Sequence, residues 1–155
     1  VDDLFWKDLC DNYIEIVKER LYQPEKHGAC EQAGARYALY HSLLGILKLY
    51  AVYVPHITDY IYQSCFRKYE KTVSVHQLLW EEGKPDEELL AFGSHVKEVI
   101  AGVRKEKTEK QQSMKEPVPQ LVITCPGRLM KYYKLSQKDI MACTSAEKIL
   151  LLATE

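Results

Sequence analysis

Apolar residues recur at intervals of three or four along most of this 155-residue chain, and this spacing constrains the fold more than any other feature. That period is typical of an α-helix with one buried face, whereas a half-buried strand alternates at every second residue. Pro55 interrupts the pattern, because its ring cannot continue the hydrogen bonds of a helix. Pro85 suits a first helical position. The spacing predicts four long helices, over residues 2–21, 30–54, 56–68 and 85–110.

The pattern changes after Gln111. Pro117 and Pro119 end the helical region, and the β-branched run that follows them predicts a strand over residues 121–124. Two short helices are expected next, over 129–133 and 136–143, with Ser136 as the N-cap of the second. A second strand is expected over 148–152. The predicted fold is mainly α: a four-helix bundle over residues 1–112, followed by a small α/β appendage over 113–155.

Charge is distributed unevenly along the chain. The net charge is only −1, which argues against an indiscriminate nucleic-acid binder, and we expect no DNA partner. Residues 1–96 carry 10 Lys and Arg against 15 Asp and Glu, whereas residues 97–138 are rich in Lys and Arg. The basic second part still allows a local surface that contacts phosphates.

The chain offers no sign of a membrane segment or of a disulfide framework. Its most apolar stretch, residues 43–54, is interrupted by Lys48, so we expect no membrane partner. The five cysteines are odd in number and far apart in sequence, which indicates reduced thiols and a cytoplasmic protein. The first residue is not Met, and the helical pattern begins almost at once, so we expect the chain to be part of a longer protein.

Residues that carry chemistry are sparse. No Gly-rich phosphate loop and no Ser, His and acid arrangement can be recognised, so we expect no catalytic residues and no cofactor in this piece. His27 and Cys30 stand three apart, but two ligands without a third make a weak zinc site, and no metal is expected. The chemistry therefore favours binding over catalysis.

Two groups of charged residues are candidates for an RNA-binding surface. The polar face of the first predicted helix has two interpretations. In the structural one it is a solvated stripe with ion pairs such as Lys7–Asp11. In the functional one its donors and acceptors bind the edges of unpaired bases. Near the end of the fourth helix, cations either complement the helix dipole or contact phosphates. The candidates are Lys7, Asp11, Glu15 and Lys18 on the first helix and Arg104 and Lys107 on the fourth.

The 11 tyrosines raise the possibility of base stacking. Most of them fall where the helical pattern calls for core or half-buried positions, so packing is the favoured interpretation. Examples are Tyr13, Tyr37, Tyr50 and Tyr60.

Several segments together resemble one known family. Residues 5–18, FWKDLCDNYIEIVK, resemble the helix that opens the anticodon-binding domain of valyl-tRNA synthetases, with its aromatic entry, Cys-Asp-x-Tyr and Lys. Residues 54–63, VPHITDYIYQ, are similar to that family's Pro-x-Ile-Thr segment. Residues 103–107, VRKEK, are similar to the end of its last long helix. The resemblance covers residues 3–125 in the same order.

The resemblance implies a function in translation. The full-length protein would attach valine to its tRNA with ATP, and this piece would hold the tRNA anticodon stem-loop beside a catalytic domain of the same chain. The ATP-binding motifs of class I synthetases are absent here. Two alternatives stay open: the same region of an isoleucyl-tRNA synthetase, which shares a turn like residues 18–22, and a helical protein-interaction module unrelated to tRNA.

Overall fold

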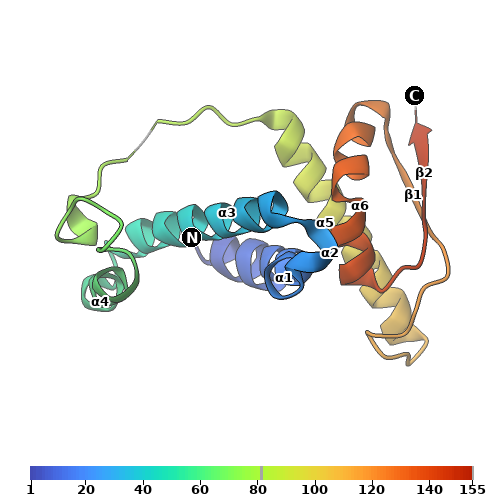
Figure 1. The fold of residues 1–155 in the computed structure, drawn as a ribbon, viewed down its shortest axis with the longest axis horizontal. Coiled ribbons are helices and arrows are strands. Elements are labelled where there is room, and N and C mark those ends of the chain that lie inside the picture. The colour runs from blue at the N-terminus through green and yellow to red at the C-terminus, as the bar shows by residue number, and fades with distance from the viewer. Residues whose placement is uncertain (81, 155) are drawn as a thin grey trace. The chain divides into compact units, whose positions relative to one another are not determined.

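The computed structural model describes residues 1–80 and 82–154 (Figure 1). Its contacts divide the chain into two units. Unit 1 comprises Val1–Glu15 and Gln23–Gly83, and unit 2 comprises Ile16–Tyr22 and the chain from Lys84 onward. The prediction of a mainly helical chain with a small α/β part is confirmed.

The first predicted helix forms, but with two kinds of turn. Residues Asp3–Tyr13 have wide π-helical turns, and the amide of Ile14 donates to the carbonyl of Leu9, five residues earlier. Residues Ile14–Tyr22 form the α-helix α1. The expected loop that follows contains a short helix, α2, over Pro24–His27. Gly28 then has a φ of 141°, and a Cβ at this position would lie 2.6 Å from the Glu31 carboxylate, so the turn into the next helix favours glycine.

Unit 1 is centred on helices α3 (Ala29–Tyr50) and α4 (Pro55–Cys65). The predicted break at Pro55 is confirmed, since this residue opens α4. The Tyr62 side chain is fully buried, and its hydroxyl donates to the Thr72 carbonyl at 2.9 Å. Both helices bury one apolar face in a shared core of Leu44, Leu47, Ala51, Tyr62, Phe66 and Val75.

The connection after α4 is fastened by polar contacts. The Asp59 carboxylate accepts from the Ser74 hydroxyl at 2.7 Å and from the Val75 amide at 3.0 Å, next to a short 3₁₀ turn over Val75–Gln77. The side chains of Leu79 and Trp80, further along this connection, are 86% and 62% exposed. Lys48 of α3 contacts both residues, because its ammonium donates to the Leu79 carbonyl at 2.6 Å and lies 4.5 Å from the Trp80 ring centre.

Unit 2 combines α5 (Glu87–Glu109), α6 (Met130–Thr144) and a two-stranded parallel sheet. The strands are β1 (Leu121–Pro126) and β2 (Ile149–Thr154), with Leu121 opposite Ile149. Helix α6 provides the crossover that a parallel pair requires. Two details of the prediction are wrong. Pro85 is not the first helical residue, because α5 begins at Glu87 with Asp86 as its N-cap. The two short helices expected after β1 are one helix, so Ser136 lies inside α6 and is not an N-cap.

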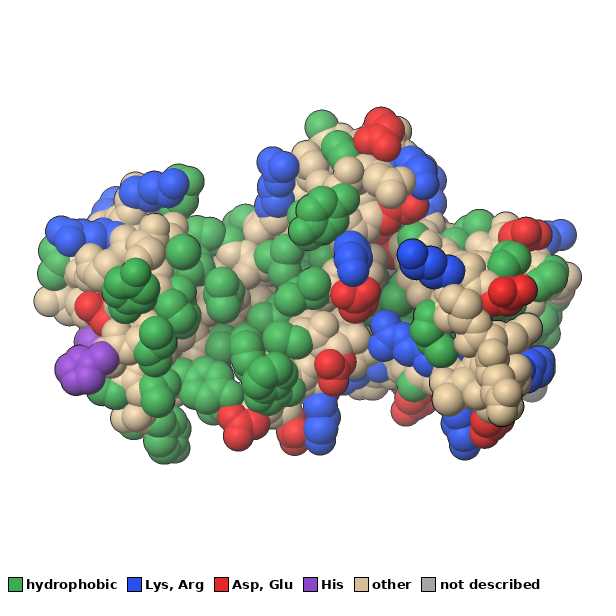
Figure 2. Space-filling view, turned by 90° about the horizontal axis from the view of Figure 1, so that it is seen from below, with side chains coloured by type: hydrophobic (Ala, Val, Ile, Leu, Met, Phe, Trp, Pro, Cys, Tyr) green, Lys and Arg blue, Asp and Glu red, His purple; other side chains and the backbone are tan. Residues whose placement is uncertain are grey.

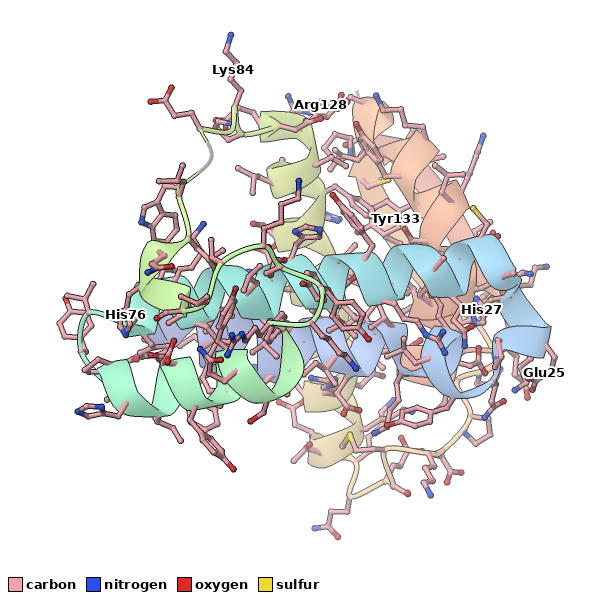
Figure 3. The ribbon with its side chains drawn as sticks, turned by 60° about the vertical axis from the view of Figure 1, so that its left-hand side comes forward. Glu25, His27, His76, Lys84, Arg128 and Tyr133 are labelled. Carbon is pink, nitrogen blue, oxygen red and sulfur yellow. The ribbon has the colours of Figure 1, made fainter. Side chains whose placement is uncertain are left out.

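The core of unit 2 explains why α5 belongs to it. Val96 and Ile100 of α5 pack with Ile123, Cys125, Leu129, Tyr133, Ile140 and Ile149. The Tyr133 hydroxyl is 2.5 Å from Nδ1 of His95, which joins α6 to α5 (Figure 3). The units therefore separate near residue 84, whereas the sequence predicted a boundary after residue 112. The apolar face of α5 is covered by the sheet and α6 of the expected appendage.

The end of α1 is tied to unit 2 by a buried ion pair. The Asp139 side chain is 3% exposed and that of Arg20 is 23% exposed, and the guanidinium donates to both carboxylate oxygens. Ile16 also packs against the unit 2 core. A bidentate Arg–carboxylate pair fixes orientation as well as distance, so this contact sets where α1 lies in unit 2.

Candidate nucleic-acid interface

Three of the predicted RNA-binding residues, Lys7, Asp11 and Glu15, lie exposed in unit 1. The Lys7 ammonium pairs with Asp3 at 2.7 Å, one turn earlier. The hydrogen bond and the attraction between the two charges raise the pKa of Lys7 and lower that of Asp3. The Lys7 side chain remains 71% exposed, so its ammonium can also reach an RNA phosphate.

The change of turn at residue 14 affects the predicted stripe. A spacing of three or four residues aligns side chains only on an α-helix, and π-helical turns are wider. Lys7 and Asp11 lie in the wide turns, whereas Glu15 and Lys18 lie in α1. All four side chains are exposed, but sequence spacing alone does not place them in one row.

The remaining predicted residues lie in unit 2, and one of them is not available to RNA. Lys18 is exposed and Arg104 is half-buried, with its guanidinium 3.8 Å from the Cys143 sulfur. Lys107 is only 4% exposed. Its ammonium donates to the carbonyls of Met114 at 2.9 Å, Glu116 at 2.6 Å and Thr144 at 2.9 Å. The prediction that Lys107 contacts phosphate is therefore corrected, because its ammonium is buried and hydrogen-bonded to three main-chain carbonyls.

The sequence contained a signal for this burial. Lys107 follows Val96, Ile100 and Val103 at intervals of four, three and four, so it occupies the apolar face of α5. A charged residue on that face must find partners when it is buried, and here they are main-chain carbonyls.

A row of cations on α6 was missed. Lys131, Lys134 and Lys138 are exposed and stand three and four residues apart, on one side of the helix, and Arg128 precedes them in the adjoining turn (Figure 3). Lys131 pairs with Glu88 at 2.6 Å. Asp139, the one carboxylate of α6, is buried with Arg20. The exposed side of α6 is therefore basic, which suits a phosphate backbone.

The expectation that the tyrosines pack in core or half-buried positions is right for some of them and wrong for others. Tyr13 and Tyr50 are half-buried, as predicted, but Tyr37 and Tyr60 are 68% and 69% exposed, so the expectation of packing is wrong for them. Tyr69 is also 67% exposed, within a basic segment after α4. Figure 2 shows hydrophobic and basic side chains together over the α4 end of unit 1. The Tyr69 ring beside its neighbouring cations is a combination that single-stranded nucleic acids bind.

Within residues 1–80 and 82–154, no three His, Cys, Asp or Glu side chains gather as metal ligands would. The helices of the same described residues include none with the length and apolar character needed to cross a membrane.

Comparison with known proteins gives a consistent result. Residues 1–123 match the family model described as the anticodon-binding domain of tRNA ligase. The chain is 32% identical over 158 aligned residues to the valine–tRNA ligase of Anaplasma marginale, covering 99% of this chain and 18% of that protein. It is 31% identical over 153 residues to that of Thermococcus kodakarensis, covering 97% and 17%. For the enzyme of Wolbachia pipientis the identity is 33% over 160 residues, covering 100% and 18%.

The chain thus spans less than a fifth of the length of these relatives. The family match extends through the helices of unit 1 and α5 of unit 2 into β1. It covers all six predicted RNA-binding residues, of which five are exposed or half-buried. The chain belongs to the family of anticodon-binding domains of tRNA ligases.

Proposed function

We propose that this chain is the anticodon-binding part of a valine–tRNA ligase and that it holds the anticodon stem-loop of valine tRNA. Two findings support the proposal. Residues 1–123 match the family model, and nearly the whole chain aligns with valine–tRNA ligases. The rest of the longer protein, including its catalytic domain, activates valine with ATP. The five cysteines form no disulfide in the described residues, which supports the cytoplasmic location that we propose.

The chemistry of the described surface supports this role. An anticodon loop presents unpaired base edges, which need hydrogen-bond partners, and phosphates, which need cations. Asp11 and Glu15 supply exposed acceptors for base edges, and Lys7, Lys18 and Arg104 supply cations. The basic side of α6 adds phosphate contacts that the predicted set lacked. These groups lie on helices, which hold side chains more firmly than loops do.

The test is binding of this chain to valine tRNA, isoleucine tRNA and an anticodon-swapped valine tRNA at several salt concentrations. Lys7→Ala and Lys18→Ala should weaken binding to all three and lower the salt slope by roughly 0.7–0.9 per lost contact. Asp11→Ala and Glu15→Ala should instead change the preference among anticodons and leave the slope nearly unchanged. Lys105→Ala, an exposed lysine of α5, serves as a control for general loss of charge.

Two results would contradict the proposal. The first is equal affinity for the three tRNAs, since an anticodon reader must distinguish them. The second is ATP–pyrophosphate exchange with valine clearly above background in a clean preparation, which would place the catalytic reaction in this piece instead of elsewhere in the longer protein.

A further inference from the structure

A continuous series of aromatic rings runs from α3 to the turn after α4, within unit 1. The Tyr37 and His41 ring centres are 4.2 Å apart, those of His41 and Tyr40 are 5.3 Å apart, and those of Tyr40 and Tyr69 are 6.1 Å apart. These four rings form the aromatic ladder. Of its two inner rings, Tyr40 is half-buried and His41 is exposed, and Tyr37 and Tyr69 at its two ends are 68% and 67% exposed. The two outer rings are therefore largely open to solvent, and each contacts an inner ring of the ladder.

The inner part of the ladder is firmly held. The Tyr40 ring packs on the buried Phe66 with ring centres 4.9 Å apart, and its hydroxyl donates to the Glu70 carboxylate at 2.6 Å. Burial and this carboxylate both raise the pKa of Tyr40, so its hydroxyl remains a neutral donor. A ring fixed before binding loses little conformational entropy on binding. The outer rings therefore lie against an inner ring whose position is fixed before RNA binds. Their own exposure is not needed for the packing of the core.

The segment that carries Tyr69 is mostly basic. Residues 66–71, FRKYEK, carry three cations, Arg67, Lys68 and Lys71, against the single carboxylate of Glu70, which Tyr40 already engages. All three cations are exposed, and the Lys68 ammonium lies 4.7 Å from the Tyr69 ring centre. Rings that accept bases, beside cations that accept phosphates, form the pattern by which proteins hold single-stranded nucleic acids.

We propose that the aromatic ladder is a stacking site for unpaired bases of the bound tRNA. Tyr37 and Tyr69 each stack on one base, and Lys68 and Lys71 contact the phosphates between or beside those bases. The inference rests on the proposed function, and it adds a second mode of recognition to the base-edge contacts of the first helix. Stacking is tolerant of sequence, because every base has a π-face. The ladder therefore contributes affinity for an open loop, and base-edge contacts contribute the choice of anticodon.

The test uses this chain with valine tRNA and with a single-stranded oligoribonucleotide of the anticodon-loop sequence. Tyr37→Leu and Tyr69→Leu should each weaken binding of both RNAs by about tenfold, since each removes one stacking face. Tyr37→Phe and Tyr69→Phe should bind like the parent, because stacking uses the ring and not the hydroxyl. Tyr60→Leu, which removes an equally exposed tyrosine of α4 outside the ladder, is the matched control. Lys68→Gln should lower the salt slope by about 0.7, whereas the tyrosine variants should leave it unchanged.

The outcomes separate the two proposals. If the parent prefers valine tRNA and both Leu variants bind as it does, the ladder is no RNA site, while the proposed function stands. If the Phe variants lose as much affinity as the Leu variants, the hydroxyls carry the contact and the stacking proposal is wrong. If the parent binds no tRNA at all, the proposed function itself fails, and a protein partner becomes the alternative occupant of the ladder. Unchanged helical circular dichroism in each variant shows that these exposed substitutions leave the fold intact.

Discussion

Replacing Lys107 by Met tests whether this lysine stabilises the fold, as the structure indicates, or contacts phosphate, as the sequence predicted. The substitution keeps the length of the side chain but removes the ammonium that three carbonyls share. Thr144 is 3% exposed, so its carbonyl finds no water, and an unsatisfied buried acceptor costs about 1–3 kcal/mol. Met114 and Glu116 are exposed, so their carbonyls can accept from water, and each loses only the net value of a hydrogen bond, about 0.5–1 kcal/mol. The expected loss of unfolding free energy is therefore about 2–5 kcal/mol.

The assay is urea unfolding of the chain, followed by helical circular dichroism. The matched control is Lys105→Met, two residues away on the same helix, where the side chain is 78% exposed and the expected change is within about 0.5 kcal/mol. Lys107→Met should also leave the salt slope of tRNA binding unchanged under conditions where it is folded. Equal unfolding midpoints for the two variants, or a salt slope lowered by Lys107→Met alone, would refute the reasoning and restore Lys107 as a phosphate contact.

Three further predictions concern other parts of the chain. Asp139→Ala should lower the unfolding free energy by about 3 kcal/mol, because it leaves the Arg20 guanidinium without its carboxylate in a mostly buried site, and urea unfolding measures this. The hydrogen bond from Ser74 lowers the pKa of Asp59, so this carboxylate stabilises the fold above its unfolded pKa and the stabilisation is lost as the pH falls through the folded value. Acid unfolding of Asp59→Asn should therefore be less steep than that of the parent. Lys134→Gln should lower the salt slope of tRNA binding by roughly 0.7–0.9, and an unchanged slope would show that the basic side of α6 is only a solvated face.

Most of the secondary structure could be predicted from local sequence. Periodicity located the long helices, Pro55 marked the start of α4, and the β-branched run at residues 121–124 marked β1. These signals are local, because a helix face or a proline acts on its own few neighbours. One local prediction failed, the break at Ser136. Helix α6 continues through Ser136 from Met130 to Thr144, so a good N-cap residue alone does not begin a helix.

The grouping of the helices and the availability of the charged side chains depended on tertiary structure. The sequence could show that α5 has an apolar face, but not that the sheet and α6 would cover it, since many surfaces satisfy one apolar stripe. Arg20 and Asp139 are 119 residues apart, and no local pattern pairs them. The sequence by itself determined the elements and, through its resemblance, the family. The sequence also placed Lys107 on the apolar face of α5, but only the fold supplied the carbonyls that its ammonium meets there. Only the fold decided that Tyr37 and Tyr69 are exposed, because burial depends on which distant segments cover a side chain.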